Sequence, residues 1–263
     1  MAFATFSKLS IAALTLVSLS ASATIAEFTT SHGNFKINLH DETTPETVRN
    51  FLNYINDGDY NNTIVHRVDP GFVMQTGGFE FTGTLPLTAI ATDSTINNEP
   101  VYSNVRGTIA MAKQKGNENS ATSQWFVNLA DNSGGSAQLD LQNGGFTVFG
   151  EVIEGMENID AIAGLSLCAS TPMPGLTTEQ CADANFVPGA ENFVTIESVT
   201  IFDATINTAD NLAAIKNTSQ TVTPTPPQAN SGGGSLAWFS LAFTGLIALR
   251  RRVIPNYCHF NRQ

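Results

Sequence analysis

The sequence predicts a mainly β protein whose short strands form a sandwich or a closed barrel. Between residue 24 and about residue 203, short apolar segments are separated by glycine and asparagine turns, a pattern typical of all-β domains. Apolar and polar residues alternate along Phe35–Leu39 and, in part, along Phe193–Ile201, as expected of strands with one buried face. Helical patterning is confined to two short segments, so helices are expected to be a minor part of the fold.

The clearer helical segment begins around Thr44 and Pro45. A threonine can cap a helix, and proline is tolerated at its first position because the missing N–H would have no partner there. Gly58 is expected to end this helix, and a second, weaker helix is predicted over residues 156–163. The first helix shows apolar residues at i, i+3, i+4 and i+7, namely Val48, Phe51, Leu52 and Ile55.

Residues 1–23 are predicted to be a secretory signal peptide rather than a buried N-terminal helix. Lys8 supplies one cation, the run 9–19 is largely apolar, and Ala21-Ser22-Ala23 has the small-x-small pattern of a cleavage site. The apolar run is too short to span a bilayer. We therefore expect export to the periplasm or the cell surface, with residues 24–203 forming the folded domain.

The C-terminal part predicts a linker followed by a membrane tail. Residues 204–235 are expected to be an extension and disordered linker, because QTVTPTPPQANSGGGS at its end has almost nothing apolar to bury. Residues 236–252 form an apolar segment closed by three arginines, as expected of a tail that remains in the membrane. Residues 253–263 are a short extension. The glycines, apolar segment and arginines together resemble the Gly-Gly C-terminal sorting signal of Gram-negative bacteria, which implies a membrane tether before any processing.

Charge and cysteine content limit the possible functions. The chain has 12 basic and 23 acidic residues, a net charge of −11, and such a surface repels phosphate backbones, so nucleic acid is not an expected partner. Cys168 and Cys181 lie 13 positions apart in a loop-like stretch and are expected to form a disulfide in an oxidising compartment. Cys258 is expected to stay unpaired. The sequence has no Cys-x-x-Cys motif and no Cys/His cluster, so no metal or other cofactor is expected.

The most informative motif is IVHRVDPGFVMQTGGF at residues 64–79. It places Arg67 in an apolar strand, where a cation either faces solvent or has a function, and taken alone it would more often be a surface residue. Two later segments change this interpretation. The first contains Met111-Ala112 and the sequence SQWF at 123–126, and the second contains Leu139-Asp140 and the sequence FTVFG at 146–150.

These motifs, in this order, resemble the cyclophilin family of peptidyl-prolyl cis-trans isomerases over residues 29–163. The resemblance implies a closed eight-stranded antiparallel barrel capped by two helices, with the peptide groove on its outer surface. It implies that Arg67 is the catalytic arginine, that Gln75 binds the substrate backbone, and that His66 is the histidine beside the arginine. It implies a substrate groove and proline pocket formed by Phe72, Val73, Ala112, Phe126, Leu139 and Phe146.

The sequence departs from the family pattern at the groove. Gln138 stands where many eukaryotic members have tryptophan, and Phe146 stands where they have histidine, which predicts weak binding of cyclosporin. Val73 replaces a usual methionine and keeps the pocket wall apolar. The loop 113–121 looks longer than usual, which could change access to the groove.

The residue types suit the isomerisation of X-Pro bonds. Resonance gives the bond a rotational barrier of about 18–20 kcal/mol, and lowering it needs no nucleophile or metal. In the twisted transition state the proline nitrogen regains lone-pair density, to which the guanidinium of Arg67 can donate a hydrogen bond. Expected partners are therefore proline-containing polypeptides, and the expected state is a monomer.

Other interpretations remain open from the sequence alone. The groove aromatics and Leu139 could be ordinary core residues, and Gln75 could serve only a turn. His66 is expected to be structural, and His32 and His40 are expected at the surface. The competing functions are a non-catalytic chaperone module that binds proline-containing peptides, and a purely structural surface protein.

Overall fold

The computed structural model describes residues 24–183, 185–204 and 208–219. The predicted signal peptide, the linker from residue 220 onward, the membrane tail, the final extension and Cys258 all lie outside the described residues, so those predictions stay predictions. In the described ranges, no helix combines the length and the apolar character needed to cross a membrane.

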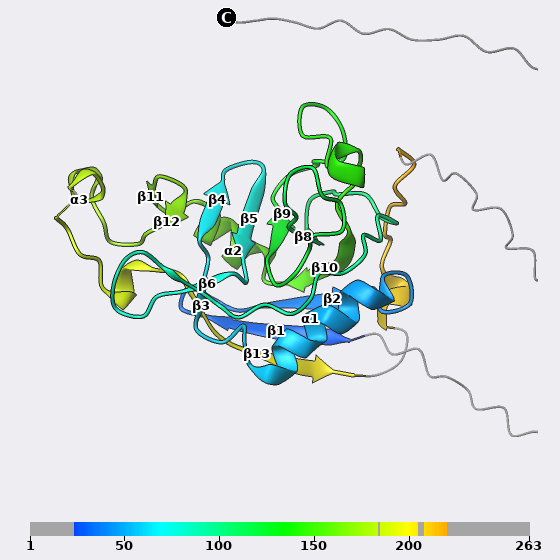
Figure 1. Ribbon diagram of the computed structural model, residues 1–263, viewed down its shortest axis with the longest axis horizontal. Helices are drawn as coiled ribbons and strands as arrows, with labels where there is room; N and C mark the ends of the chain where they lie inside the picture. The colour runs from blue at the N-terminus through cyan, green and yellow to red at the C-terminus, as the bar shows by residue number, and fades with distance from the viewer. Residues whose placement is uncertain (1–23, 184, 205–207, 220–263) are drawn as a thin grey trace, which may run out of the picture. The chain divides into compact units, whose positions relative to one another are not determined.

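Most strands join one antiparallel sheet, which confirms the mainly β prediction (Figure 1). Its eleven strands follow the order β4-β5-β9-β8-β10-β2-β1-β13-β3-β6-β7, while β11 and β12 form a separate pair. The strands are β1 (Ile25–Thr30), β2 (Phe35–Leu39), β3 (Thr63–Ile64), β4 (Arg67–Asp69), β5 (Val73–Thr76), β6 (Phe79–Glu80), β7 (Thr88–Ala89), β8 (Thr108–Met111), β9 (Trp125–Asn128), β10 (Val148–Glu154), β11 (Leu167–Cys168), β12 (Thr171–Pro172) and β13 (Thr195–Asp203).

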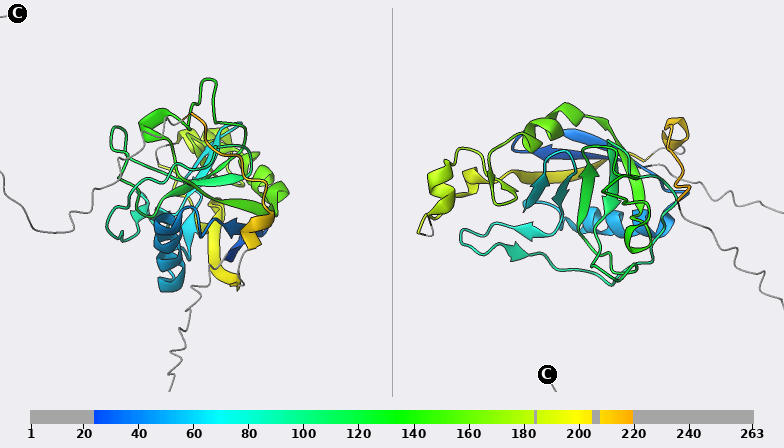
Figure 2. Two further views of the ribbon diagram at one scale, coloured as in Figure 1. Left: turned by 90° about the vertical axis from the view of Figure 1, so that its right-hand side faces the viewer. Right: turned by 90° about the horizontal axis from the view of Figure 1, so that it is seen from above.

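The sheet curls, so that β4, β5, β8 and β9 cross over β1 and β2 (Figures 1 and 2). In the described residues the hydrogen-bonded order runs from β4 at one end to β7 at the other. Closure into a barrel of eight strands therefore stays a prediction.

Both predicted helices are present, α1 (Pro45–Asp57) and α2 (Met156–Ala163). Gly58 ends α1 in the left-handed conformation, with φ 77°, as predicted. Thr44 does not cap α1 with its side chain and instead donates to the His40 carbonyl. The Glu99 carboxylate accepts from the N–H groups of the first turn, so a distant loop satisfies donors that a cap would have taken. The shorter helices are α3 (Thr178–Ala182), η1 (Gln142–Gly144), η2 (Ala190–Asn192) and η3 (Thr208–Asn211).

An aromatic core lies between the curled sheet and α1. The ring of Phe28 stacks on Phe35 at a centroid distance of 4.8 Å. Phe51, on the apolar face of α1, meets the edge of Trp125 at 5.6 Å and of Phe149 at 4.9 Å. These contacts explain why the 3.6-residue periodicity of α1 was readable in the sequence, because its apolar face packs on the sheet.

His40 is not at the surface as expected, since only 3% of it is exposed. It follows β2 directly, and β2 lies between β1 and β10, so neighbouring strands cover the end of the strand. The His40 ring packs on Tyr102 at a centroid distance of 4.6 Å. Burial lowers the pKa of His40 to about 4, so it is neutral at pH 7 and forms no ion pair with Glu151, 3.7 Å away.

The described part of the C-terminal extension is hydrogen-bonded to the domain, although residues 204–235 were expected to be an extension and disordered linker. The N–H of Ser103 donates to the carbonyl of Ile215 at 2.8 Å, and the N–H of Asn217 donates to the carbonyl of Val101 at 2.9 Å. The Asn217 amide also donates to the backbone carbonyl of Asp140 at 3.0 Å. The segment pairs by backbone groups, which composition alone does not reveal.

Candidate active site

The structure brings all the site residues predicted from the sequence to a single pocket of about 240 Å³. The strand register explains this convergence: Arg67 on β4 lies opposite Gln75 on β5, which lies opposite Phe126 on β9. Side chains at such paired positions emerge on the same face of a sheet. The lining consists of Arg67, Phe72, Val73, Gln75, Ala112, Phe126, Leu139 and Phe146, together with Lys113 and Gln142.

The floor of the pocket is apolar and buried. Val73 is 2% exposed, and Phe126 and Leu139 are each 5% exposed. With Ala110 and Val148 they form a pocket cluster separate from the main core. The interpretation of Phe126 and Leu139 as core residues is thus compatible with the functional one, because the same side chains close a small core and present its outer surface to the pocket.

Two half-buried aromatic residues stand at the rim of the pocket. The Phe146 ring approaches Phe126 at 5.8 Å, with an interplanar angle of 70°. The Phe72 ring lies 5.9 Å from the guanidinium carbon of Arg67. A proline ring is apolar and compact, so a site with a buried floor and aromatic rims suits it.

The polar wall of the pocket is a chain of hydrogen bonds centred on Arg67. Its guanidinium donates to the Gln75 side-chain oxygen at 3.3 Å and to the Asp69 carboxylate at 3.1 Å. The Gln75 amide nitrogen then donates to Gln124 Oε1 at 2.8 Å. Gln75 is therefore part of a strand and of this chain, not of a turn.

Arg67 keeps the capacity to bind a ligand. Its side chain is 38% exposed, and its ion pair with Asp69 is also exposed and so stabilises the fold little. A guanidinium has five N–H donors, and the bonds to Gln75 and Asp69 occupy only some of them. The residue is thus oriented by its neighbours with donors left for another molecule.

Buried polar side chains brace the pocket from behind. Asp140, next to Leu139, is 2% exposed, and its Oδ1 accepts from the Asn104 N–H at 2.8 Å and from the Asn104 amide at 3.1 Å. The same amide donates to the carbonyl of Phe146 at 3.1 Å. On the other side, the Asn132 amide donates to the carbonyl of Phe72 at 2.8 Å. The backbone that carries the apolar wall is therefore fixed at several points.

His66 has the structural role that was expected. Burial is the main cause that lowers its pKa to about 4, and the charge of Arg67 contributes to this lowering. Its ring packs edge-on against Phe79 at 4.9 Å. His66 does not line the pocket, and an imidazole with so low a pKa is a weak base.

Sequence reasoning missed three polar residues of the site. Gln124 lies in the SQWF motif, whose aromatic residue alone was given a role, and Lys113 follows the Met111-Ala112 motif directly. Gln142 carried no signal, since it enters the pocket from the short helix η1. Gln138 is not part of the pocket lining, so weak cyclosporin binding stays a prediction.

Metal binding has no candidate site in the part of the chain that the structure describes. No group of three or more His, Cys, Asp or Glu side chains there is arranged to hold an ion. The polar chain around Arg67 instead offers hydrogen-bond donors and acceptors to an uncharged ligand such as a peptide backbone.

Comparisons with known proteins show which family this chain resembles. The family model described as "Cyclophilin type peptidyl-prolyl cis-trans isomerase/CLD" matches residues 25–182. Peptidyl-prolyl cis-trans isomerase B of Escherichia coli is 44% identical over 146 residues, covering 53% of this chain and 84% of the relative. Isomerase A of Dickeya dadantii is 45% identical over 139 residues, covering 51% and 68%. An isomerase of Acinetobacter baylyi is 42% identical over 144 residues, covering 54% and 73%.

Proposed function

Since this chain belongs to the family of cyclophilin-type peptidyl-prolyl cis-trans isomerases and is an isomerase of X-Pro bonds, we propose that catalysis takes place in the pocket around Arg67. The observation that carries the proposal is the position of an exposed, oriented guanidinium beside a buried apolar floor. The guanidinium can reach the nitrogen of the rotating X-Pro bond while the apolar floor holds the proline ring.

The geometry suits stabilisation of a twisted amide. The apolar floor, with Phe126 and Leu139, holds the proline ring, and Gln75 binds the substrate backbone on one side of the bond. Arg67 donates to the proline nitrogen, whose lone pair is available only when the amide is twisted. The hydrogen bond from Arg67 to the proline nitrogen is therefore stronger in the transition state than in the planar ground state, as catalysis requires. No covalent intermediate is needed.

The remaining parts of the proposal concern the setting of the enzyme. Its substrates are proline-containing segments of exported proteins, and it acts as a monomer in the periplasm or at the cell surface, tethered or released at its C-terminal tail. The pattern of residues 1–23 and the Cys168–Cys181 disulfide support an oxidising compartment. We also propose that the sheet closes as the eight-stranded barrel of the family.

A chaperone that binds proline-containing peptides without isomerising them is the alternative. Such a chaperone could bind proline on the same apolar floor, but peptide binding alone does not require the guanidinium of Arg67 at the pocket. Arg67 therefore separates the two functions.

The experiment is an isomerisation assay on X-Pro peptides with Arg67→Ala and, as a matched control, Arg49→Ala on the exposed side of α1. We expect Arg67→Ala to lower kcat/KM by about 100-fold or more, equivalent to about 2.7 kcal/mol, with an unchanged circular dichroism spectrum. Arg49→Ala should retain full activity, because Arg49 is exposed and not part of the pocket lining. Full activity of folded Arg67→Ala would contradict the proposed mechanism.

A further inference from the structure

The pocket contains a second cation, Lys113, to which the mechanism assigns no role. Its ammonium donates to the carbonyl oxygen of Asn143 at 2.8 Å and to that of Gly145 at 2.7 Å. It also lies 4.9 Å from the centroid of the Phe146 ring. The charge is thus fixed at the wall of the proline pocket instead of moving freely in solvent.

The two cations of the pocket differ in how their charge is compensated. Arg67 forms an ion pair with Asp69. Among the described residues no carboxylate forms an ion pair with Lys113, whose two acceptors are neutral carbonyls. An ammonium has three N–H donors, so these two bonds leave one donor for a ligand.

Partial burial makes the charge of Lys113 more effective than that of a surface lysine. The side chain is half-buried, and charges interact more strongly where water is partly excluded. The molecule as a whole is acidic, with a net charge of −11, so attraction of an anion at this point is a local property of the pocket and not of the whole surface.

We propose that Lys113 is a specificity-determining residue that favours substrates with a carboxylate close to the isomerising proline. The inference rests on the proposed function of the pocket and names a substrate class for it, X-Pro segments with a nearby Asp or Glu. The third N–H of Lys113 donates to this carboxylate, and such a charge-assisted bond is stronger than one between neutral groups.

The preference for acidic substrates should depend on pH. Burial lowers the pKa of Lys113 to about 8, and the carboxylate of Glu118 in the same loop partly offsets this effect. Across the pocket, β4 contributes the charge of Arg67, which is paired with Asp69 outside the pocket lining. Lysine is charged below its pKa, so the preference should be present at pH 6.5 and fade as the pH rises through 8.

The test compares matched peptides in which Glu or Gln occupies each of the two positions before and the two positions after proline. A protease-free isomerisation assay gives kcat/KM for each peptide. At one position or more we expect the Glu peptide to exceed the Gln peptide by about fivefold, the size of a favourable exposed or half-buried ion pair. The ratio should fall to about one in Lys113→Met.

Two further variants separate charge from structure. Lys113→Arg keeps a positive charge at any accessible pH, so its preference should persist at pH 9.5, where the unmodified enzyme has lost it. Lys115→Met removes an exposed cation of the same loop and should leave the ratio unchanged. A displaced Phe146 in Lys113→Met would lower activity on Glu and Gln peptides alike and would not change their ratio.

The result that would overturn the inference is a Glu-to-Gln ratio near one at every position in the unmodified enzyme, or a ratio that Lys113→Met leaves unchanged. Activity on the Gln peptides reports the isomerase function independently. If the unmodified enzyme did not isomerise the Gln peptides, the proposed function would be contradicted. If it isomerised Gln and Glu peptides equally well, only the role of Lys113 would be contradicted.

Discussion

Two small apolar clusters flank the main core, and they are secured in different ways. The pocket cluster around Phe126 is held by buried hydrogen bonds, chiefly those between Asp140 and Asn104. The second, the disulfide cluster, comprises Ile64, Met173, Leu176 and Phe193, and the chain segment that covers it is crosslinked by Cys168 and Cys181. The pocket cluster is thus braced by buried hydrogen bonds, whereas the segment that covers the disulfide cluster carries a covalent crosslink within itself.

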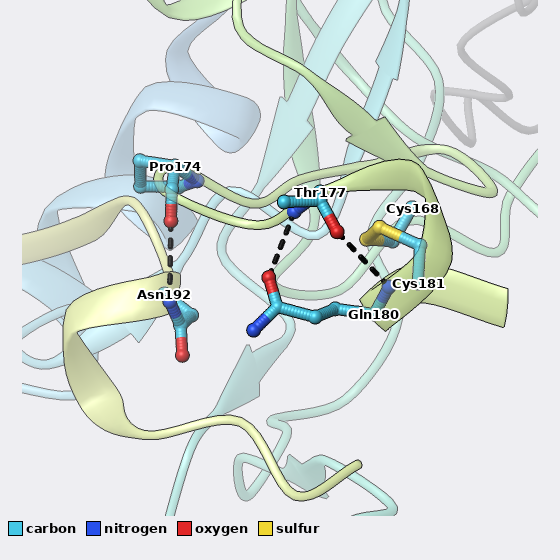
Figure 3. The surroundings of a disulfide bond; sticks show 6 residues. All are labelled: Cys168, Pro174, Thr177, Gln180, Cys181 and Asn192. Carbon is cyan, nitrogen blue, oxygen red and sulfur yellow. Dashed lines mark hydrogen bonds between the residues drawn. A yellow bond between two sulfur atoms is a disulfide. The ribbon is translucent and has the colours of Figure 1, made fainter. Parts of the chain in front are cut away.

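Figure 3 shows the hydrogen bonds around the disulfide in the segment that covers the disulfide cluster. The helix α3 has five residues and is capped locally, since Thr177 and Gln180 exchange hydrogen bonds between backbone and side chain. Asn192 donates to the carbonyl of Pro174 at 3.2 Å. Two further bonds join the segment to β4 and the residue before it, since the Val68 N–H donates to the Ser170 carbonyl at 2.6 Å and the Thr171 hydroxyl donates to the His66 carbonyl at 2.8 Å. The disulfide restricts the unfolded chain and so lowers the entropy cost of ordering this segment.

One histidine touches the aromatic edge of each cluster, and His40 is buried whereas His66 is half-buried. The His40 ring packs on Tyr102, which borders the pocket cluster, and the His66 ring packs on Phe79, which borders the disulfide cluster. Burial is the main cause of a pKa lowered from 6.5 to about 4 in both residues. Lowering the pH is therefore expected to destabilise both regions, because it protonates a histidine beside each cluster.

The largest effect on stability is expected from acid. As the pH falls, both histidines bind protons at a higher pH in the unfolded chain than in the folded one. Their contribution to the free energy of unfolding is therefore complete above pH 6.5 and decreases as the pH drops toward 4. Each unit by which folding lowers a histidine pKa contributes about 1.4 kcal/mol, which gives roughly 3 kcal/mol for each residue. Urea unfolding at pH 7 and pH 4.5 measures the loss.

Single variants divide this acid sensitivity between the two regions. Protonated His40 can pair with Glu151, whereas protonated His66 faces the charge of Arg67. We therefore expect His66→Gln to lose less stability between pH 7 and pH 4.5 than the unmodified protein, and by a wider margin than His40→Gln. Equal losses in all three proteins would show that carboxylates, not histidines, control the acid response.

Breaking the polar brace should affect both stability and catalysis. Asp140→Ala removes the acceptor of two donors of Asn104, which are left buried, at a cost of about 3 kcal/mol in unfolding free energy. Activity should fall as well, because Leu139 and Phe146 are attached to this network. Asp160→Ala is the control, since its ion pair with Arg106 is exposed and should contribute less than about 1 kcal/mol. If the two variants unfolded at the same urea concentration, the brace would have no special role.

The sequence predicted what depends on local pattern. The helix α1 and the strand β2 follow from periodicity, and the pocket residues follow from motifs whose order carries the resemblance to the family. The burial of His40 was not predicted, because it depends on which strands flank β2, and strand order is set by distant contacts. Lys113 was missed for a similar reason, since its role depends on two carbonyls about 30 residues away in the chain.

The disulfide was predicted from spacing and compartment, and the structure confirms that Cys168 and Cys181 are joined. Because neither cysteine lines the catalytic pocket, the replacement of both by serine should separate stability from activity. Opening a loop with a sequence separation of 13 should lower the free energy of unfolding by roughly 2–3 kcal/mol. The value of kcat/KM at 25 °C should stay within about twofold of the unmodified enzyme, since the pocket cluster and its hydrogen bonds remain intact.

Urea unfolding and the isomerisation assay on the same preparation check both halves of this last prediction, and unmodified protein reduced with dithiothreitol should match the double variant in both. A folded double variant with strongly reduced activity would mean that the cover of the disulfide cluster controls the pocket. The two clusters would then be one cooperative unit, and the contrast between a hydrogen-bonded pocket and a crosslinked cover would be wrong.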